Sequence, residues 1–218
     1  MKNKKAKKFV KGLIKWSLTN LRKFPWRKKT ATPFEVFVAE MLLRKTSANA
    51  VASLFDEFIE KYPTFKELSQ ANEKELVRLL QPLGLHNRRA KALHEIAVNL
   101  SSCGLPNTEQ DLLELPHTGR YVANATLCFG FGRRKPIIDT NVARIYSRVF
   151  GLEVKKNQLH QDDALWEFAE QLLPLRLFRR YNFALLDFGA IICKQSSPLC
   201  STCFARSYCT YPSKEIPV

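Results

Sequence analysis

The sequence predicts an all-α protein. Apolar residues recur at helical spacing along most of the 218 residues, β-branched runs are short, and Gly or Pro residues separate the periodic segments. Ile137-Ile138 is the one candidate for an extended segment. A composition of 45% hydrophobic and 25% charged residues is ordinary for a globular chain, and a chain of this length can bury a sizeable core without a disulfide framework.

The expected elements follow in chain order. An amphipathic segment at about 9–21 ends at the FPWR stretch, 24–27, and residues 34–46 form a helix that is apolar on almost every side. A helix of that kind is usually buried. Gly84 and the 104–107 stretch mark breaks. Further helices are expected at about 48–61, 64–70, 73–81, 87–101, 109–114, 119–131, 140–150, 162–173 and 179–192.

Positive charge is concentrated at the start of the chain. The net charge is +15, yet residues 1–33 hold twelve Lys and Arg and no carboxylate, which leaves 23 basic and 20 acidic residues in the remainder. The lysines at 2–8 are either a solvated tail or a phosphate-binding segment. No apolar run is long enough to span a membrane, and the N-terminus lacks the features of a secretion signal. We therefore expect a cytoplasmic, nucleoid-associated protein.

Four of the six cysteines lie close together in the stretch CKQSSPLCSTCFARSYC. Cys193, Cys200, Cys203 and Cys209 fall within 17 residues and can converge on one metal centre. Two disulfides or a structural zinc are the alternatives. The lack of a secretion signal disfavours disulfides, and ligand type does not separate zinc from an iron–sulfur cluster. The other two cysteines stand apart and are expected to be small apolar fillers or inert thiols.

The stretch LPHTGRYVANA contains a second pattern. Pro116 and Gly119 bracket a tight turn, and a helix is expected directly after it. Backbone N–H groups at a helix start suit a phosphate, although many helices begin in this way and the signal is weak by itself. Asp139, eighteen residues after Tyr121, precedes another expected helix and is on these grounds an ordinary N-cap.

The cysteine spacing and this turn resemble those of the endonuclease III family of helix-hairpin-helix DNA glycosylases. The resemblance covers essentially the whole chain, from the FPWR stretch to Cys209. It implies a [4Fe–4S] cluster on the four grouped cysteines, in the loop 193–209, and a helix-hairpin-helix motif at about 109–131. The family's hairpin is usually Leu-Pro-Gly-x-Gly, and His117 replaces its first glycine here. If that position needs a positive φ, the histidine is strained.

The resemblance also implies three catalytic residues. Asp139, in PIIDTNVARI, matches the carboxylate that stabilises positive charge on the sugar and orients or deprotonates the attacking water. Tyr121 stands where strand-nicking members carry a nucleophilic lysine. A tyrosine at this position resembles the thymine–guanine mismatch glycosylases of the family. Its alternative is a packed aromatic residue without a role. Glu40 matches a glutamate that contacts the flipped base, and its alternative is an exposed i,i+4 ion pair with Arg44.

Three DNA-contacting segments are implied as well. One segment, LLRKT, enters the gap left by the flipped nucleotide. It has Arg-Lys where adenine-specific relatives have two glutamines. The second, PLGLHNRRA, supplies an apolar wedge, whose alternative role is packing on its own helix. The third is the hairpin. The residues assigned are Arg44, Lys45 and Thr46 in the first segment, Leu85 in the second, and His117, Gly119 and Arg120 in the third.

Together these patterns predict a two-lobed fold and a repair activity. Residues 30–136 are expected to form a six-helix lobe, and residues 1–29 and 137–218 a cluster lobe, with the extruded base held between the lobes. Asp187, on an otherwise apolar helix, is interpreted as a structural cap or bridge. The expected protein is a monomeric, monofunctional glycosylase that hydrolyses thymine, and also uracil, opposite guanine in double-stranded DNA.

Two alternatives remain from the sequence. One is an adenine glycosylase acting opposite oxidised guanine, although such enzymes usually carry an additional C-terminal domain. The other, from a different class, is a non-catalytic iron–sulfur DNA-binding protein. The intact carboxylate at Asp139 argues against the second alternative, because a protein that only binds DNA has no need of that site.

Overall fold

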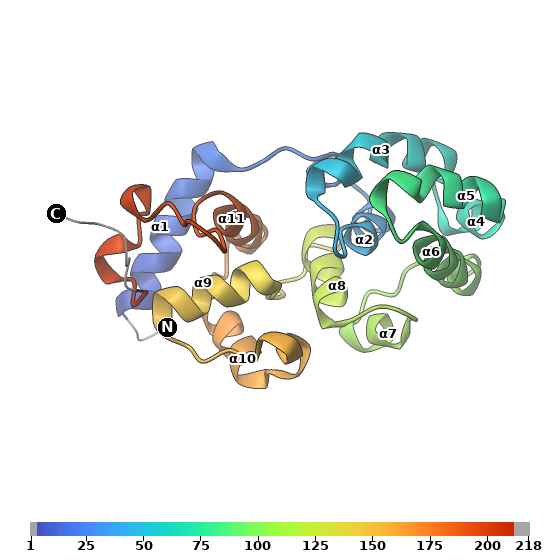
Figure 1. The fold of residues 1–218 in the computed structure, drawn as a ribbon. Helices are drawn as coiled ribbons and strands as arrows, with labels where there is room; N and C mark the ends of the chain where they lie inside the picture. The colour runs from blue at the N-terminus through green and yellow to red at the C-terminus, as the bar shows by residue number, and fades with distance from the viewer. Residues whose placement is uncertain (1–3, 212–218) are drawn as a thin grey trace. The chain divides into compact units, whose positions relative to one another are not determined.

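The computed structural model describes residues 4–211, apart from the side chains of 156 and 157, and no strand forms in that part of the chain (Figure 1). The prediction of an all-α protein is confirmed. The α-helices are α1 (Lys4–Asn20), α2 (Pro33–Leu42), α3 (Ala48–Lys61), α4 (Phe65–Ser69), α5 (Glu73–Leu80), α6 (His86–Leu100), α7 (Glu109–Glu114), α8 (Arg120–Ala125), α9 (Thr140–Phe150), α10 (Asp163–Leu172) and α11 (Phe178–Ile191). Short 3₁₀ turns lie at Pro25–Arg27, Gln81–Leu83, Lys156–Gln161, Cys200–Thr202 and Arg206–Tyr208, and a π turn at Thr126–Gly130.

The chain forms two compact units. The central unit comprises Lys23–Arg133, and the terminal unit is built from both chain ends, Met1–Arg22 and Arg134–Val218. The sequence predicts the corresponding lobe at 30–136. Each unit has a hydrophobic core of its own, so each buries its apolar helix faces internally.

The core of the central unit is built around α2. Phe37, Val38 and Leu42 are fully buried, because this helix carries apolar residues on all of its faces. Its start is fixed by a capping box, in which the Thr32 side chain accepts a hydrogen bond from the backbone N–H of Glu35 and the Glu35 side chain accepts one from Thr32. The buried helix is thereby locked at its N-terminal end.

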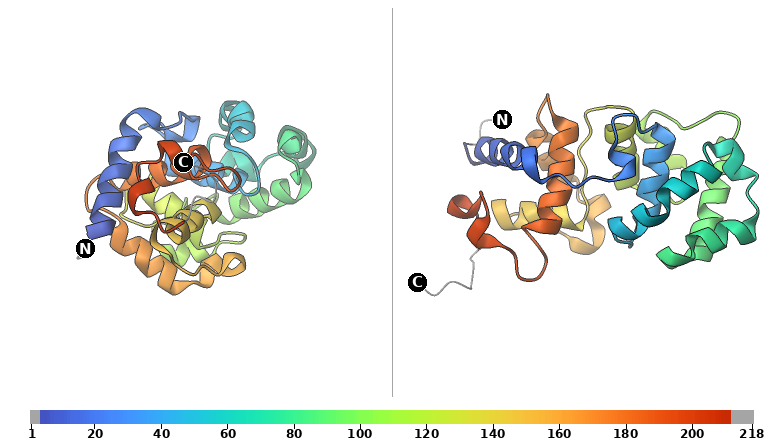
Figure 2. Two further views of the ribbon diagram at one scale, coloured as in Figure 1. Left: turned by 60° about the vertical axis from the view of Figure 1, so that its left-hand side comes forward. Right: turned by 90° about the horizontal axis from the view of Figure 1, so that it is seen from above.

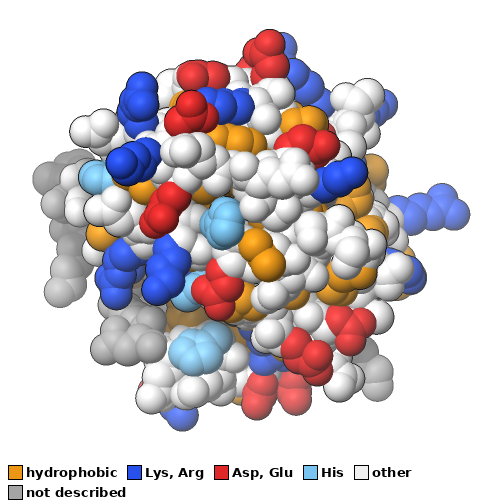
Figure 3. Space-filling view, turned by 90° about the vertical axis from the view of Figure 1, so that its right-hand side faces the viewer, with side chains coloured by type: hydrophobic (Ala, Val, Ile, Leu, Met, Phe, Trp, Pro, Cys, Tyr) orange, Lys and Arg blue, Asp and Glu red, His pale blue; other side chains and the backbone are white. Residues whose placement is uncertain are grey.

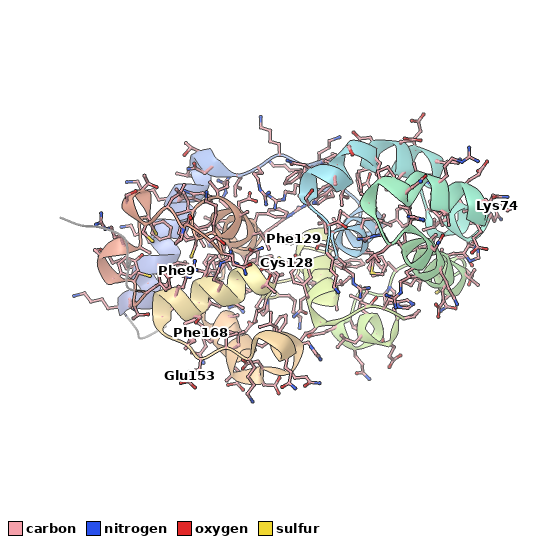
Figure 4. The ribbon with its side chains drawn as sticks, in the orientation of Figure 1. Phe9, Lys74, Cys128, Phe129, Glu153 and Phe168 are labelled. Carbon is pink, nitrogen blue, oxygen red and sulfur yellow. The ribbon has the colours of Figure 1, made fainter. Side chains whose placement is uncertain are left out.

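Two helix boundaries differ from expectation. The helix expected over 34–46 ends at Leu42, because the chain turns at Lys45 with φ 56°. The helix expected over 119–131 is α-helical only as far as Ala125 and continues as the π turn. Cys128 and Phe129, on that turn, are buried in the structure (Figure 4). The filler role expected for the isolated cysteines therefore holds for Cys128, whereas Cys103 is exposed.

The terminal unit packs α1 and α9 against α11, and the loop 193–209 folds beside them (Figure 2). Phe9, which is labelled in Figure 4, belongs to α1. The centroid of its ring lies 5.3 Å from that of Phe150 and 5.7 Å from that of Phe204. Asp187, on α11, is fully buried and accepts hydrogen bonds of 2.9 Å from the backbone N–H and 2.7 Å from Nε of Arg22. The structural bridge interpreted for Asp187 is thus confirmed.

Basic residues are distributed unevenly over the surface. The face drawn in Figure 3 mixes Lys and Arg with Asp and Glu side chains, and neither sign dominates it. On α1, by contrast, exposed lysines recur at a spacing that places them on one side of the helix, at positions 4, 8, 11 and 15. Lys2 lies outside the described residues. None of the helices in the described range is long and apolar enough to cross a membrane.

Candidate active site and cysteine pocket

Asp139 is held at the start of α9 by both of its carboxylate oxygens. Oδ1 accepts a hydrogen bond of 2.7 Å from the backbone N–H of Val142, and Oδ2 accepts one of 2.8 Å from Nδ2 of Asn141. The expected N-cap is therefore present. Burial raises the pKa of the Asp139 carboxyl, while the hydrogen bonds and the charge of Arg144 act in the opposite direction. This carboxylate is oriented and partly withdrawn from water.

A hydrogen-bond chain leads from Asp139 to the first of the grouped cysteines. Asn141 donates to Asp139 and in turn accepts a bond of 2.8 Å from Nη2 of Arg144. The same guanidinium donates to the carbonyl oxygens of Cys193 and Gly189, each at 2.9 Å. Gly189 is necessary for this packing, since a Cβ there would lie 2.7 Å from the Cβ of Asn141. The chain connects the end of α11 to the candidate catalytic carboxylate.

The four grouped cysteines line one pocket of the terminal unit. Cys193, Cys200, Cys203 and Cys209 share it with apolar side chains and with Arg148, whose Nη1 lies 3.8 Å from Sγ of Cys193. Burial raises the pKa of the Cys203 thiol to about 11, and the three other thiols add to this rise because they are close to it. All four cysteines, closely spaced in the sequence, therefore line one pocket.

The four thiols do not form a closed site for a single metal ion. Among the described residues, no group of three or more His, Cys, Asp or Glu side chains is arranged to hold one metal ion. A structural zinc needs four ligand atoms at about 2.0–2.3 Å from one centre. The arrangement seen here is thus a thiol-lined pocket, without the tight geometry of a single-ion site.

Glu40 and Tyr121 belong to the central unit. Glu40, on α2, is 3% exposed, so it does not stand on an exposed helix edge. Tyr121, on α8, is half-buried and packs against the core of this unit. The Arg44 side chain turns to a different loop, where Nη1 donates a bond of 3.0 Å to the carbonyl oxygen of His117. Glu40 is therefore a buried acid within an apolar helix.

The backbone of the hairpin is strained at His117, as the sequence predicts for a histidine at a position with positive φ. His117 has a φ of 61°, a left-handed conformation that costs a non-glycine residue about 1–2 kcal/mol. Its Nε2 lies 3.4 Å from Oε2 of Glu95. Gly119 has an extended backbone, and a Cβ placed on it would meet no atom within 4 Å. The space in front of the first turn of α8 is therefore open. Arg120, the first residue of α8, lies 3.9 Å from Glu109.

Two further loops of the central unit carry the same kind of strain. Lys45 has φ 56° and Leu85 has φ 51°, and Leu85 is 54% exposed at the start of α6. The Thr46 side chain bonds within the protein, with Arg89 and with the Leu83 carbonyl oxygen. The residues left facing outward in the 44–46 segment are thus the two basic ones. Both loops and the hairpin line one hollow, formed by Met41, Leu42, Arg44, Lys45, Leu85, Arg88, Arg89, Ala92, Leu93 and His117.

Three side chains that hold these sites together were not singled out from the sequence. They are Arg89, Asn141 and Arg144. Arg89 stands inside the PLGLHNRRA stretch, and Asn141 and Arg144 stand inside PIIDTNVARI. For Arg144, which stands between Ala143 and Ile145, the available signal was an arginine among apolar neighbours, because such a residue must find hydrogen-bond acceptors when its helix packs.

Comparison with known proteins identifies the family. A family model described as HhH-GPD superfamily base excision DNA repair protein matches residues 38–171. A "Thymine/uracil-DNA glycosylase" of Methanothermobacter thermautotrophicus is 35% identical over 215 residues, which cover 97% of this chain and 96% of that protein. One of the same description from Pyrobaculum aerophilum is 37% identical over 214 residues, covering 95% and 93% of the two chains.

A solved structure agrees with these relatives. The "structure of a thermostable thymine-DNA glycosylase" superposes with a TM-score of 0.88 at 35% identity, over 96% of this chain and 97% of that one. The expected helix-hairpin-helix glycosylase fold is confirmed by this likeness. This chain belongs to the HhH-GPD superfamily of base excision DNA repair proteins.

Proposed function

We propose that this chain is a monofunctional DNA glycosylase that removes thymine, and also uracil, mispaired with guanine. The relatives with the names reported above cover nearly the whole chain and act on thymine or uracil according to those names. The observation that carries the proposal is Asp139, a carboxylate oriented by two hydrogen bonds and given a raised pKa by burial. We also propose that the protein acts on duplex DNA as a monomer.

Asp139 would act on the sugar carbon from which the base leaves. Breaking the N-glycosidic bond builds positive charge on the sugar, and a fixed carboxylate in a poorly solvated place stabilises that charge more than water does. The carboxylate can also take a proton from the attacking water. The N–H of Val142 and the amide of Asn141 hold the two oxygens in position, so that no reorientation is needed during the reaction.

Tyr121 accounts for the proposed absence of strand nicking. A phenol cannot form the Schiff base through which a lysine amine cleaves the DNA strand after base release. Glu40, buried in α2, would contact the extruded base or a water beside it. In this proposal the basic side chains of Arg44 and Lys45, with Leu85, contact the DNA where the base has left, and the open first turn of α8 binds a backbone phosphate.

The cysteine pocket fits a [4Fe–4S] cluster by the chemistry of its donors. All four cysteines line the pocket, and no carboxylate or histidine lines it. Cys193, Cys200, Cys203 and Cys209 would be the ligands. When bound, the cluster would supply four iron–thiolate bonds that tie the loop 193–209 to the end of α11.

The activity is tested with short duplexes containing G·T, G·U, oxidised-G·A or a damaged pyrimidine, each scored with and without alkali. We expect strand breaks at G·T and G·U only after alkali treatment. Release of adenine would overturn the substrate assignment and leave the chemistry of Asp139 standing. If no duplex yields a free base, the proposed function is wrong and a DNA-binding role takes its place.

The cluster is tested separately by substitution. Cys203→Ser should lower the iron content and the visible absorbance of the purified protein and reduce its thermal stability. Cys103→Ser is the matched control, because this exposed cysteine lies outside the pocket and its replacement should change none of the three. Zinc instead of iron in the purified wild-type protein would refute the cluster assignment.

A further inference from the structure

Arg89 is a buried arginine that joins two loops. It is 9% exposed and lies in the first turns of α6. Its Nε donates a hydrogen bond of 2.9 Å to the carbonyl oxygen of Gly84, and its Nη2 donates one of 2.7 Å to the carbonyl oxygen of Arg44. Nη1 donates to the carbonyl oxygen of Leu42 at 2.9 Å, and Thr46 Oγ1 is a further partner of Nη2. One guanidinium therefore holds the backbone of both loops.

Each of the two carbonyl groups bonded by Arg89 immediately precedes a strained residue. The peptide of Arg44 directly precedes Lys45, and the peptide of Gly84 directly precedes Leu85. Lys45 and Leu85 are the non-glycine residues with positive φ in these loops, at 56° and 51°. A strained backbone conformation persists where its surroundings hold it in place. Here the Arg89 side chain holds the peptide that precedes each of the two strained residues.

The partners of Arg89 are unusual for a buried cation. Every acceptor that the structure shows for it is a backbone carbonyl or a hydroxyl oxygen, and none is a carboxylate. Burial and the neighbouring charge of Arg44 lower the pKa of Arg89. A planar guanidinium presents five donors in a fixed fork to the carbonyls of both loops, whereas an ammonium group has three donors and no fixed plane. The geometry is thus suited to fixing backbone shape.

We propose that Arg89 is a positioning residue that locks the 44–46 and 84–85 segments into one preformed surface for insertion into DNA. This rests on the proposed function, which assigns DNA contact to Arg44, Lys45 and Leu85. Opening a base pair requires the inserted side chains to replace stacking that the DNA loses. A surface that is already ordered does not have to be ordered during that step. Without Arg89 the loops would lose their common anchor.

The test compares two DNA substrates that differ in the free energy needed to unpair the thymine. One duplex carries thymine paired with guanine, and the other carries thymine opposite an abasic-site analogue, where the base is already unpaired. Single-turnover base release is measured on both, and the ratio of the two rates is taken within each variant, so that a fraction of unfolded protein cancels. The variants are Arg89→Gln and, as a control, Arg78→Gln, which removes an exposed arginine from the same unit.

We expect Arg89→Gln to lower the paired-to-unpaired rate ratio about tenfold or more, while Arg78→Gln leaves it unchanged. Arg89→Lys, which keeps the charge and loses the planar fork, should lower the ratio in the same direction and serves if the glutamine variant does not fold. A ratio that equals that of the wild type in both Arg89 variants overturns the proposal, even if both absolute rates fall.

A second readout does not depend on base release. 2-Aminopurine placed beside the mismatched thymine becomes brighter when its neighbour is unstacked. With the Asp139→Asn protein the brightening on saturation should be large, and with Asp139→Asn/Arg89→Gln it should be smaller at the same saturation. Equal brightening in the two proteins contradicts the positioning role. If the wild-type protein releases no base, the proposed function fails, yet this comparison still decides the role of Arg89.

Discussion

Nε of Arg144 donates a hydrogen bond of 2.9 Å to the carbonyl oxygen of Cys193. The two residues are 49 positions apart in the chain. The other end of the same guanidinium is bonded to Asn141, which is bonded to Asp139. The orientation of the candidate catalytic carboxylate thus depends on the position of Cys193, which follows the end of α11.

Replacing Arg144 tests this dependence. Arg144→Gln cannot bridge Asn141 and the two backbone carbonyls, so we expect the single-turnover rate of base release to fall about tenfold to 100-fold. Affinity for mismatched DNA should change far less, since no DNA contact is assigned to Arg144. Arg176→Gln, an exposed arginine of the same unit, is the control. A normal rate in Arg144→Gln would show that Asn141 alone suffices to orient Asp139.

Removing the charge of Asp139 should separate catalysis from binding. Asp139→Asn keeps the size of the side chain and an acceptor for the N–H of Val142, while the negative charge is lost. We expect base release to fall by about 10²–10⁴-fold, the range typical of a lost acid–base group. Equilibrium binding to G·T duplex should remain close to that of the wild type. A fully active variant would exclude Asp139 from the chemistry.

The raised pKa of Asp139 predicts an acid limb in the pH–rate profile. The carboxylate is the active form, and burial raises its pKa above the ordinary value of about 3.9. The rate should therefore decline as the pH falls through this raised pKa, at a pH where an ordinary aspartate is still ionised. Single-turnover rates measured at saturating enzyme, with binding checked at each pH, give the profile. A rate that stays level down to pH 4 would contradict this expectation.

An amine at position 121 should introduce strand nicking. Tyr121→Lys places a nucleophile at the half-buried start of α8, and we expect some DNA to be cleaved without alkali. The covalent intermediate can be trapped with borohydride and seen as a shifted band on a denaturing gel. Tyr121→Phe is the control, because it keeps the aromatic ring and adds no amine. Absence of trapping in Tyr121→Lys would mean that position 121 does not face the sugar.

Glycine at position 117 should stabilise the protein. His117 has a φ of 61°, and glycine adopts this conformation without the steric cost that a Cβ brings. We expect His117→Gly to raise the free energy of unfolding by about 1 kcal/mol, measured by urea denaturation with an unchanged slope. His94→Gly, in the middle of α6, should act in the opposite direction. A destabilised His117→Gly would show that the His117–Glu95 contact outweighs the strain.

The sequence by itself determined the features that depend on neighbouring residues. Helix α3 was expected at 48–61 and is observed there, because its cap and its apolar spacing are local signals. Asp139 was recognised as an N-cap for the same reason. The spacing of the four cysteines predicted that their thiols would meet, since 17 residues contain all of them. The all-α fold and the family followed from such patterns.

Only the tertiary structure decided what depends on distant partners. Helix α2 ends at Leu42 rather than at 46, and Arg89, 45 positions after Arg44, is bonded to the turn that follows. Arg144 reaches a carbonyl 49 positions away. Hydrogen bonds over such separations leave no periodic signal in the sequence, since the acceptor is a backbone carbonyl that every residue type provides. The partners of these two arginines were therefore visible only in the folded chain.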